Sequence, residues 1–94
     1  MSSQAAPDAQ APGFEGQIPS VNAIVTEVVG SLALAAHAYM SDAALDLDSA
    51  GVAIDVASLA FDRIKERLTA DERLAITQLL TETRLAYVRR REAK

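Results

Sequence analysis

The chain has 94 residues and a mass of 10.0 kDa, enough for one small domain but not for two. Half of the residues are hydrophobic, although 19 of them are alanine, and the net charge of −4 argues against DNA as a partner. The absence of cysteine excludes disulfides and cysteine-based zinc sites, and a single histidine excludes a poly-histidine metal site.

Residues 1–20 have the composition of a disordered tail. They contain all three prolines and two of the four glycines, and few of their side chains could offset the entropy lost on ordering. Phe14 and Ile18 are the only large apolar residues after Met1, which leaves open a short stretch that docks on the domain. The start has no Lys or Arg and no apolar run, so we expect no secretory signal and a cytoplasmic location.

A first helix is predicted over residues 21–40, with Ser20 as its N-cap. Its uncharged run, residues 28–41, covers 14 positions, fewer than the roughly 20 that a membrane span needs, so no transmembrane span is expected and a membrane partner is disfavoured. At 100° per residue, one apolar face consists of Val21, Ile24, Val25, Val28, Val29, Leu32, Ala35, Ala36 and Tyr39. The opposite, weakly polar side consists of Thr26, Glu27, Gly30, Ala33, Leu34 and His37.

A second helix is predicted over residues 48–68, after a connection in which Asp46 or Asp48 can act as the N-cap. Its main apolar face consists of Ala50, Ile54, Ala57, Phe61, Ile64 and Leu68. A second apolar strip, roughly on the other side, consists of Val52, Val56 and Leu59 and runs on into Arg63.

The third helix, predicted over residues 70–91, has the clearest start signal in the chain. Thr69 and Glu72 have the spacing of a capping box, in which each side chain accepts a hydrogen bond from the other residue's backbone. One apolar face consists of Ile76, Leu79, Leu80, Thr83 and Tyr87, and another side carries Leu74, Leu85 and Val88.

The predicted fold is all-α: a three-helix arrangement with a disordered N-terminal tail and a single domain over residues 21–91. The break between the second and third helices is only Leu68–Thr69, so these two helices should form a C-terminal antiparallel hairpin. The first helix should pack across that hairpin.

No motif in the chain indicates catalysis, a cofactor or a metal site. A phosphate-binding loop, a zinc-protease motif and a dinucleotide fingerprint are all absent. One alternative is a ligand-binding or enzymatic bundle that uses His37 with Asp55 or Asp62. Arginines gather near the end of the third helix, where they form either a solvated helix end or a contact for an anionic partner, such as an acidic protein, anionic lipid or RNA. They are Arg84, Arg89, Arg90 and Arg91, and those in the last turn are expected to be dispensable for folding.

Each predicted helix offers more apolar surface than a small three-helix monomer can cover, because domains of this size bury only about 60% of their unfolded surface. We therefore predict a non-enzymatic, self-associating interaction module, most simply a two-fold dimer, that can also dock on a larger protein. The candidate interface residues are Gly30, Leu34, Val52, Val56, Leu59, Leu74, Leu85 and Val88. Two alternatives remain: the strips cover each other within one chain through alanine-rich packing, or the protein binds a membrane surface peripherally.

A resemblance to a known family covers residues 31–90. The stretches that carry it are Ser31-Leu32-Ala33, Asp46-Leu47, Ala53-Ile54-Asp55, the run from Arg63 to Glu72, Leu79-Leu80 and the run from Arg84 to Val88. They resemble the bacterial domain-of-unknown-function family 1844, with Glu66-Arg67 at the place where the family pattern has Gly-Asn. The resemblance implies a small helical bacterial protein; the family has no established activity, so it implies no catalytic residue.

Overall fold

The computed structural model describes residues 18–93, which form three α-helices, two short 3₁₀ turns and no β-strand. The helices are α1 (Val21–Tyr39), α2 (Leu47–Ile64) and α3 (Ala70–Glu92). The predicted all-α fold is therefore confirmed. The predicted tail lies almost entirely outside the described residues, since only Ile18, Pro19 and Ser20 belong to them; these three residues are not helical.

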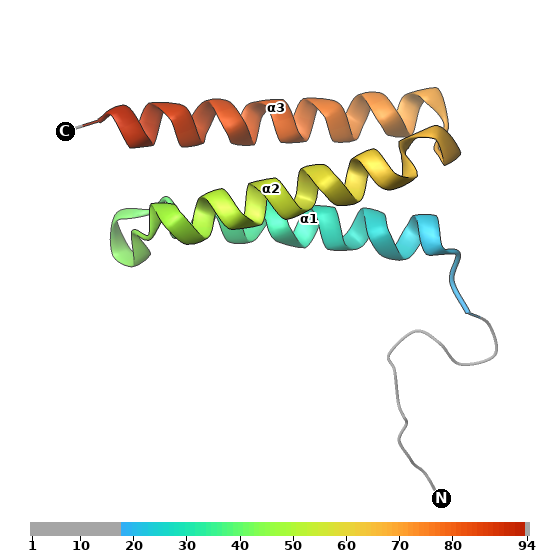
Figure 1. Cartoon of the computed structure of the whole chain (residues 1–94), viewed down its shortest axis with the longest axis horizontal. Coiled ribbons are helices and arrows are strands. Elements are labelled where there is room, and N and C mark those ends of the chain that lie inside the picture. Colours follow the sequence, from blue (N-terminus) through green and yellow to red (C-terminus); the bar gives the residue numbers. More distant parts are fainter. Residues whose placement is uncertain (1–17, 94) are drawn as a thin grey trace, which may run out of the picture.

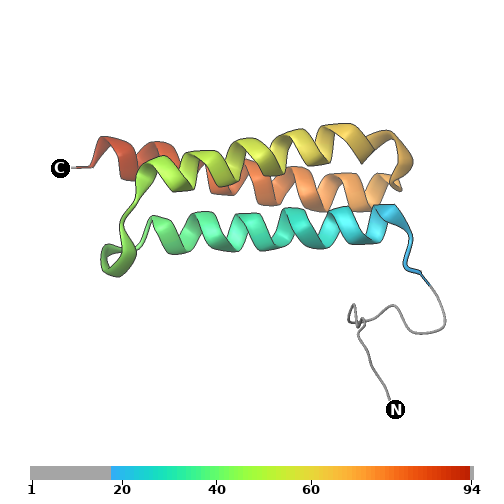
Figure 2. The same cartoon turned by 60° about the horizontal axis from the view of Figure 1, so that its bottom comes forward.

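The three helices form a bundle in which each is antiparallel to the one before it (Figures 1 and 2). Residues 40–46, which include the 3₁₀ turn η1 (Asp42–Ala44), connect α1 to α2, and the turn η2 (Lys65–Arg67) leads into α3. The C-terminal hairpin of α2 and α3 is as predicted. However, α1 lies alongside α2 rather than across the hairpin, and α2 packs more extensively against α1 than against α3.

Each helix begins where a polar side chain caps its first turn. Ser20 and Asp46 both accept hydrogen bonds from backbone N–H groups three residues later, at 3.1 and 3.0 Å. Thr69 and Glu72 form the predicted capping box, at 3.1 and 2.9 Å. These caps satisfy N–H groups that have no partner within the helix, so the sequence signals for the three starts are confirmed.

Small side chains line the contact between α1 and α2. Four alanines are almost completely buried there, and a methyl side chain lets two helix backbones approach closely. They are Ala36, Ala50, Ala53 and Ala57. Larger buried side chains fill the remaining interior: Val29, Met40, Ile54, Phe61, Ile64, Leu68, Ile76 and Leu80.

The predicted orientation of α1 is wrong by part of a turn. Ala33, expected on the outer side, is 2% exposed, whereas Val21, Val28 and Tyr39, expected on the core face, are 48%, 45% and 38% exposed. The physical reason is that α1 packs against α3 as well as α2: Ala33 lies one turn before His37, which contacts Thr83 of α3. Val21 and Val28 consequently remain on the surface, whereas Val29 is buried.

Candidate interaction surfaces

Apolar side chains extend over the side of the bundle where α1 and α2 meet, away from α3. A groove of about 300 Å³ runs between these helices and is lined by Leu32, Ala35, Tyr39, Ser49, Val52 and Ala53. The exposed apolar side chains on this side, here called the α1–α2 face, are Val21, Val28, Tyr39, Val52, Val56 and Leu59. Ala35 and Val52 line the groove and so mark this side of each helix. Val28 and Val21 lie two and four turns before Ala35, and Val56 lies one turn after Val52, so these residues are on the same side.

Gly30 and Leu34, the two predicted interface residues of α1, lie on a different flank of the bundle. The ring of His37 approaches Thr83 of α3, with 3.3 Å between Nε2 and Oγ1, so this side of α1 is turned toward α3. Leu34, one turn before His37, is 75% exposed, and a Cβ built on Gly30 would meet nothing within 4 Å. Gly30 and Leu34 are therefore not part of the α1–α2 face.

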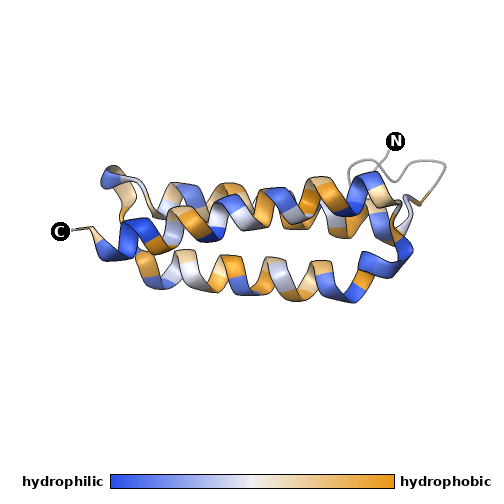
Figure 3. Cartoon of the chain, turned by 90° about the horizontal axis from the view of Figure 1, so that it is seen from above, coloured by the Kyte–Doolittle hydropathy of each residue, from blue (hydrophilic) through white to orange (hydrophobic). Residues whose placement is uncertain are grey.

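The predicted residues of α3 form a third strip. Leu74 and Leu85 are exposed on the outer side of the helix, and Val88 borders a groove of about 210 Å³ between α2 and α3. The eight predicted interface residues thus occupy three separate flanks, and only Val52, Val56 and Leu59 lie on the α1–α2 face. Figure 3 shows hydrophobic segments recurring along all three helices, which is why hydropathy alone does not distinguish the flanks.

Gly51 has a role that was not predicted. It faces Tyr87 of α3, whose hydroxyl lies 3.2 Å from the position that a Cβ on residue 51 would occupy. A glycine inside an otherwise regular helical pattern is a signal of such a close approach. The aromatic ring therefore packs directly against the α2 backbone.

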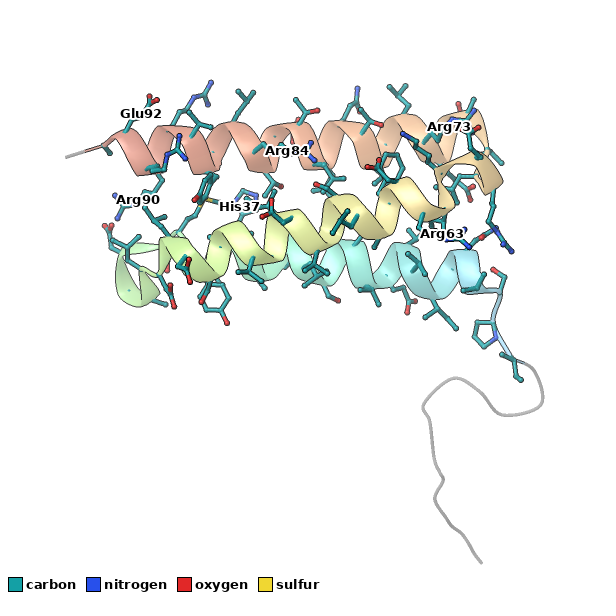
Figure 4. The ribbon with its side chains drawn as sticks, in the orientation of Figure 1. His37, Arg63, Arg73, Arg84, Arg90 and Glu92 are labelled. Carbon is teal, nitrogen blue, oxygen red and sulfur yellow. The ribbon has the colours of Figure 1, made fainter. Side chains whose placement is uncertain are left out.

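Two arginines of α3 close the C-terminal ends of the other helices. Arg90 donates from Nε to the backbone carbonyl of Met40 at 2.9 Å and from Nη2 to the Asp42 carboxylate at 2.6 Å. At the opposite end of the bundle, Arg73 donates from Nη1 to the carbonyls of Lys65 and Leu68, at 3.1 and 2.9 Å (Figure 4). A guanidinium is well suited to these sites because it supplies donors to unpaired carbonyls and positive charge to the negative end of a helix.

The other C-terminal arginines have separate contacts, although Arg84 and Arg91 both lie near Tyr87. Arg84 donates to the hydroxyl of Ser58 on α2, Arg91 lies 5.6 Å from the ring centroid of Tyr87, and Arg89 is exposed. Arg90 is engaged with the end of α1, and the predicted anionic-partner contact stays a prediction. The tertiary contacts of Arg90 were not predicted, and the dispensability of the last-turn arginines for folding stays a prediction.

The residues of the predicted ligand-binding alternative lie apart. Asp62 pairs with Lys65 at 3.4 Å, Asp55 borders the α2–α3 groove, and His37 is bonded to Thr83. Thr83 is fully buried, and its hydroxyl donates to the Leu79 carbonyl, so it accepts from the His37 ring. Within residues 18–93 no three side chains of the metal-binding types gather.

The polar groups at the helix starts are engaged in capping. The backbone N–H and the hydroxyl of Ser49 both donate to Asp46, and these bonds hold the pKa of that carboxyl below its usual value. A groove of about 420 Å³ near the start of α1 is bordered by Ser20 and Glu72, which cap α1 and α3. Asn22, in the same groove, accepts from Arg67 Nε at 2.8 Å.

Within the described part of the chain, α1 alone is long and apolar enough to cross a membrane by length and composition, criteria that the core helix of a soluble protein also meets. The resemblance to domain-of-unknown-function family 1844 stays a prediction. No family model, curated protein or solved structure matched the chain.

Proposed function

We propose that this protein is a non-enzymatic interaction module that self-associates through the α1–α2 face. The observation that carries the proposal is the set of six large apolar side chains, each 38–69% exposed, on two adjacent helices. Contiguous apolar patches larger than a few hundred Å² are rare on monomeric soluble proteins and mark interaction sites. A second copy of the chain would cover this face with a surface of the same chemistry.

The face is just large enough for a specific interface between two copies. α1 has 19 residues and is therefore about 28 Å long, and two helices packed 8–10 Å apart present a width of about 20 Å. This corresponds to roughly 550 Å² per copy, or about 1,100 Å² for two copies, close to the ~1,000 Å² that a specific interface needs. A second copy alone could therefore cover the patch with enough area for specific binding.

A membrane surface is the second candidate, favoured by the length and apolar composition of α1. Helices that lie in a membrane interface carry Lys and Arg on their polar face, where these residues meet anionic headgroups. Over its whole length α1 has neither residue; its only ionisable groups besides Tyr39 are Glu27 and His37. The charge pattern thus favours a protein partner over a lipid surface.

Matched charge substitutions on two flanks test the proposal. Val56 on the α1–α2 face and Leu85 on the outer side of α3 are 45% and 48% exposed. At micromolar concentration, light scattering after size exclusion should give about twice the 10.0 kDa chain mass for the parent protein and for Leu85→Glu. Val56→Glu should give the monomer mass with unchanged helix content.

A parent protein that remains folded as a monomer would contradict the proposal. So would a dimer that Leu85→Glu disrupts and Val56→Glu does not. If the monomer instead binds vesicles containing anionic lipid, and Val56→Glu abolishes that binding, the face serves a membrane and the proposal is wrong.

A further inference from the structure

The distribution of residues along α2 has a symmetry that fixes how two copies would meet. We infer that the α1–α2 faces of two copies pack together with each α2 antiparallel to the other α2, around a two-fold axis that passes beside Val56 perpendicular to the helices. This inference rests on the proposed self-association and adds its orientation and register.

The apolar strip of α2 is self-complementary about Val56. Val52 and Ala60, which is half-buried against the core, lie four residues before and after it, and Ser49 and Arg63 lie seven residues before and after it. A two-fold axis at Val56 therefore places apolar residues opposite apolar residues at the centre and polar residues at both ends. An isologous interface requires this kind of self-matching, because the same patch serves both copies.

Charge then favours the antiparallel orientation. The start of α2 carries Asp46 and Asp48, and the strip ends at Arg63, about 22 Å further along the helix from Asp48. In an antiparallel pair, Arg63 of each copy lies near Asp48 of the other copy, so the dimer contains two such contacts. A two-fold axis parallel to the helices would instead place the acidic start of α2 beside the same end of the other copy, and Arg63 beside the other Arg63. Like charges would then meet at both ends. Charged residues at an interface rim select orientation in this way.

The neighbouring helix is compatible with this arrangement. Tyr39 shares a groove with Ser49 and Val52, so in the antiparallel course of α1 and α2 Val28 lies about 16 Å further along, and the level of Val56 falls about midway between Tyr39 and Val28. The side of α1 that belongs to the face carries Val21, Val28 and Tyr39 and no charged residue. The α1 helices of the two copies therefore meet through apolar side chains only, and the register is set by α2.

Disulfide cross-linking tests the register, because the sequence contains no cysteine. A disulfide requires Cα atoms within about 7 Å, so Val56→Cys, beside the axis, should convert to a covalent dimer under mild oxidation. Ser49→Cys alone and Arg63→Cys alone should remain uncross-linked, because each residue would lie about 20 Å from its own symmetry mate. An equimolar mixture of these two variants should yield the cross-linked heterodimer. Leu85→Cys is the control on the outer side of α3 and should not cross-link.

Failure of the register and failure of self-association give different results. If light scattering shows dimers but Arg63→Cys cross-links alone and the mixture does not, the antiparallel register is wrong while the proposed function stands. If every variant is monomeric and none cross-links, the proposed function fails as well. Efficient cross-linking of Leu85→Cys would place the interface on α3 and overturn both.

Charge reversal provides a second measurement that needs no new bond. Arg63→Glu should raise the dimer dissociation constant about threefold to tenfold, since it converts two rim attractions into repulsions. Adding Asp48→Arg should recover most of that loss. A double variant no tighter than Arg63→Glu alone would contradict the pairing of these residues.

Discussion

At the residue scale, the sequence determines the helix starts but not the rotation of α1. Ser20, Asp46 and the Thr69–Glu72 box are local signals, since each cap involves residues only three positions apart, and all were predictable. The burial of Ala33 was not predictable from the sequence. A helical wheel ranks positions by hydrophobicity, whereas the rotation of α1 depends on its contacts with both α2 and α3, such as that of His37, one turn after Ala33, with Thr83.

Removing the threonine hydroxyl of the capping box should lower the stability of the protein. Thr69→Ala leaves the Glu72 N–H without its side-chain acceptor, and the free energy of unfolding should fall by about 1 kcal/mol. Chemical denaturation followed by circular dichroism measures this change. An unchanged midpoint would show that solvent or a neighbouring group replaces the cap.

The two glycines of the helices should respond differently to alanine. At Gly30 a methyl group meets open space, so Gly30→Ala should stabilise the protein by about 0.5–1 kcal/mol through helix propensity. At Gly51 the same methyl meets the Tyr87 hydroxyl at 3.2 Å, so Gly51→Ala should gain less or lose stability. Thermal melts of the two variants compare these effects directly; a larger gain at Gly51 would contradict the packing of Tyr87 against α2.

At the element scale, α3 joins the bundle partly through polar side chains. Arg73 and Arg90 close the C-terminal ends of α2 and α1, and Arg84 reaches Ser58 on α2. The existence of the three helices and the α2–α3 hairpin followed from periodicity and a short connection. The partners of Arg90 could not be predicted in this way, because Met40 lies 50 residues earlier in the chain and no local pattern connects the two residues.

Arg90 should therefore matter for stability while its neighbour does not. Arg90→Gln removes the ion pair with Asp42 and weakens the cap on Met40, and should cost about 1–2 kcal/mol. Arg89→Gln, one position away and exposed, should change stability by less than about 0.5 kcal/mol. Urea denaturation of the two variants tests this; equal midpoints would mean that the Arg90 contacts contribute nothing in solution.

At the scale of the whole molecule, the exposed apolar face follows from the way the chain uses alanine. Alanines fill much of the α1–α2 contact, and Val21, Val28, Val52, Val56 and Leu59 remain exposed while Val29 lies in the core. The sequence predicted that apolar strips would be left over. It could not predict which strips adjoin, because that depends on how each helix is rotated and on which pairs pack most closely. Val52 and Val56 thus share a face with Val28, which was expected in the core, and not with Leu34 or Leu85.

Intermolecular nuclear Overhauser effects measure most directly which face a second copy covers. In a sample that mixes isotope-labelled and unlabelled chains, filtered spectra report only contacts between different copies. We expect such contacts from the methyl groups of Val28, Val52 and Val56, including Val56 to its own counterpart, and none from Leu74 or Leu85. Contacts from Leu74 and Leu85, with none from Val56, would show that a second copy covers α3 and not the α1–α2 face.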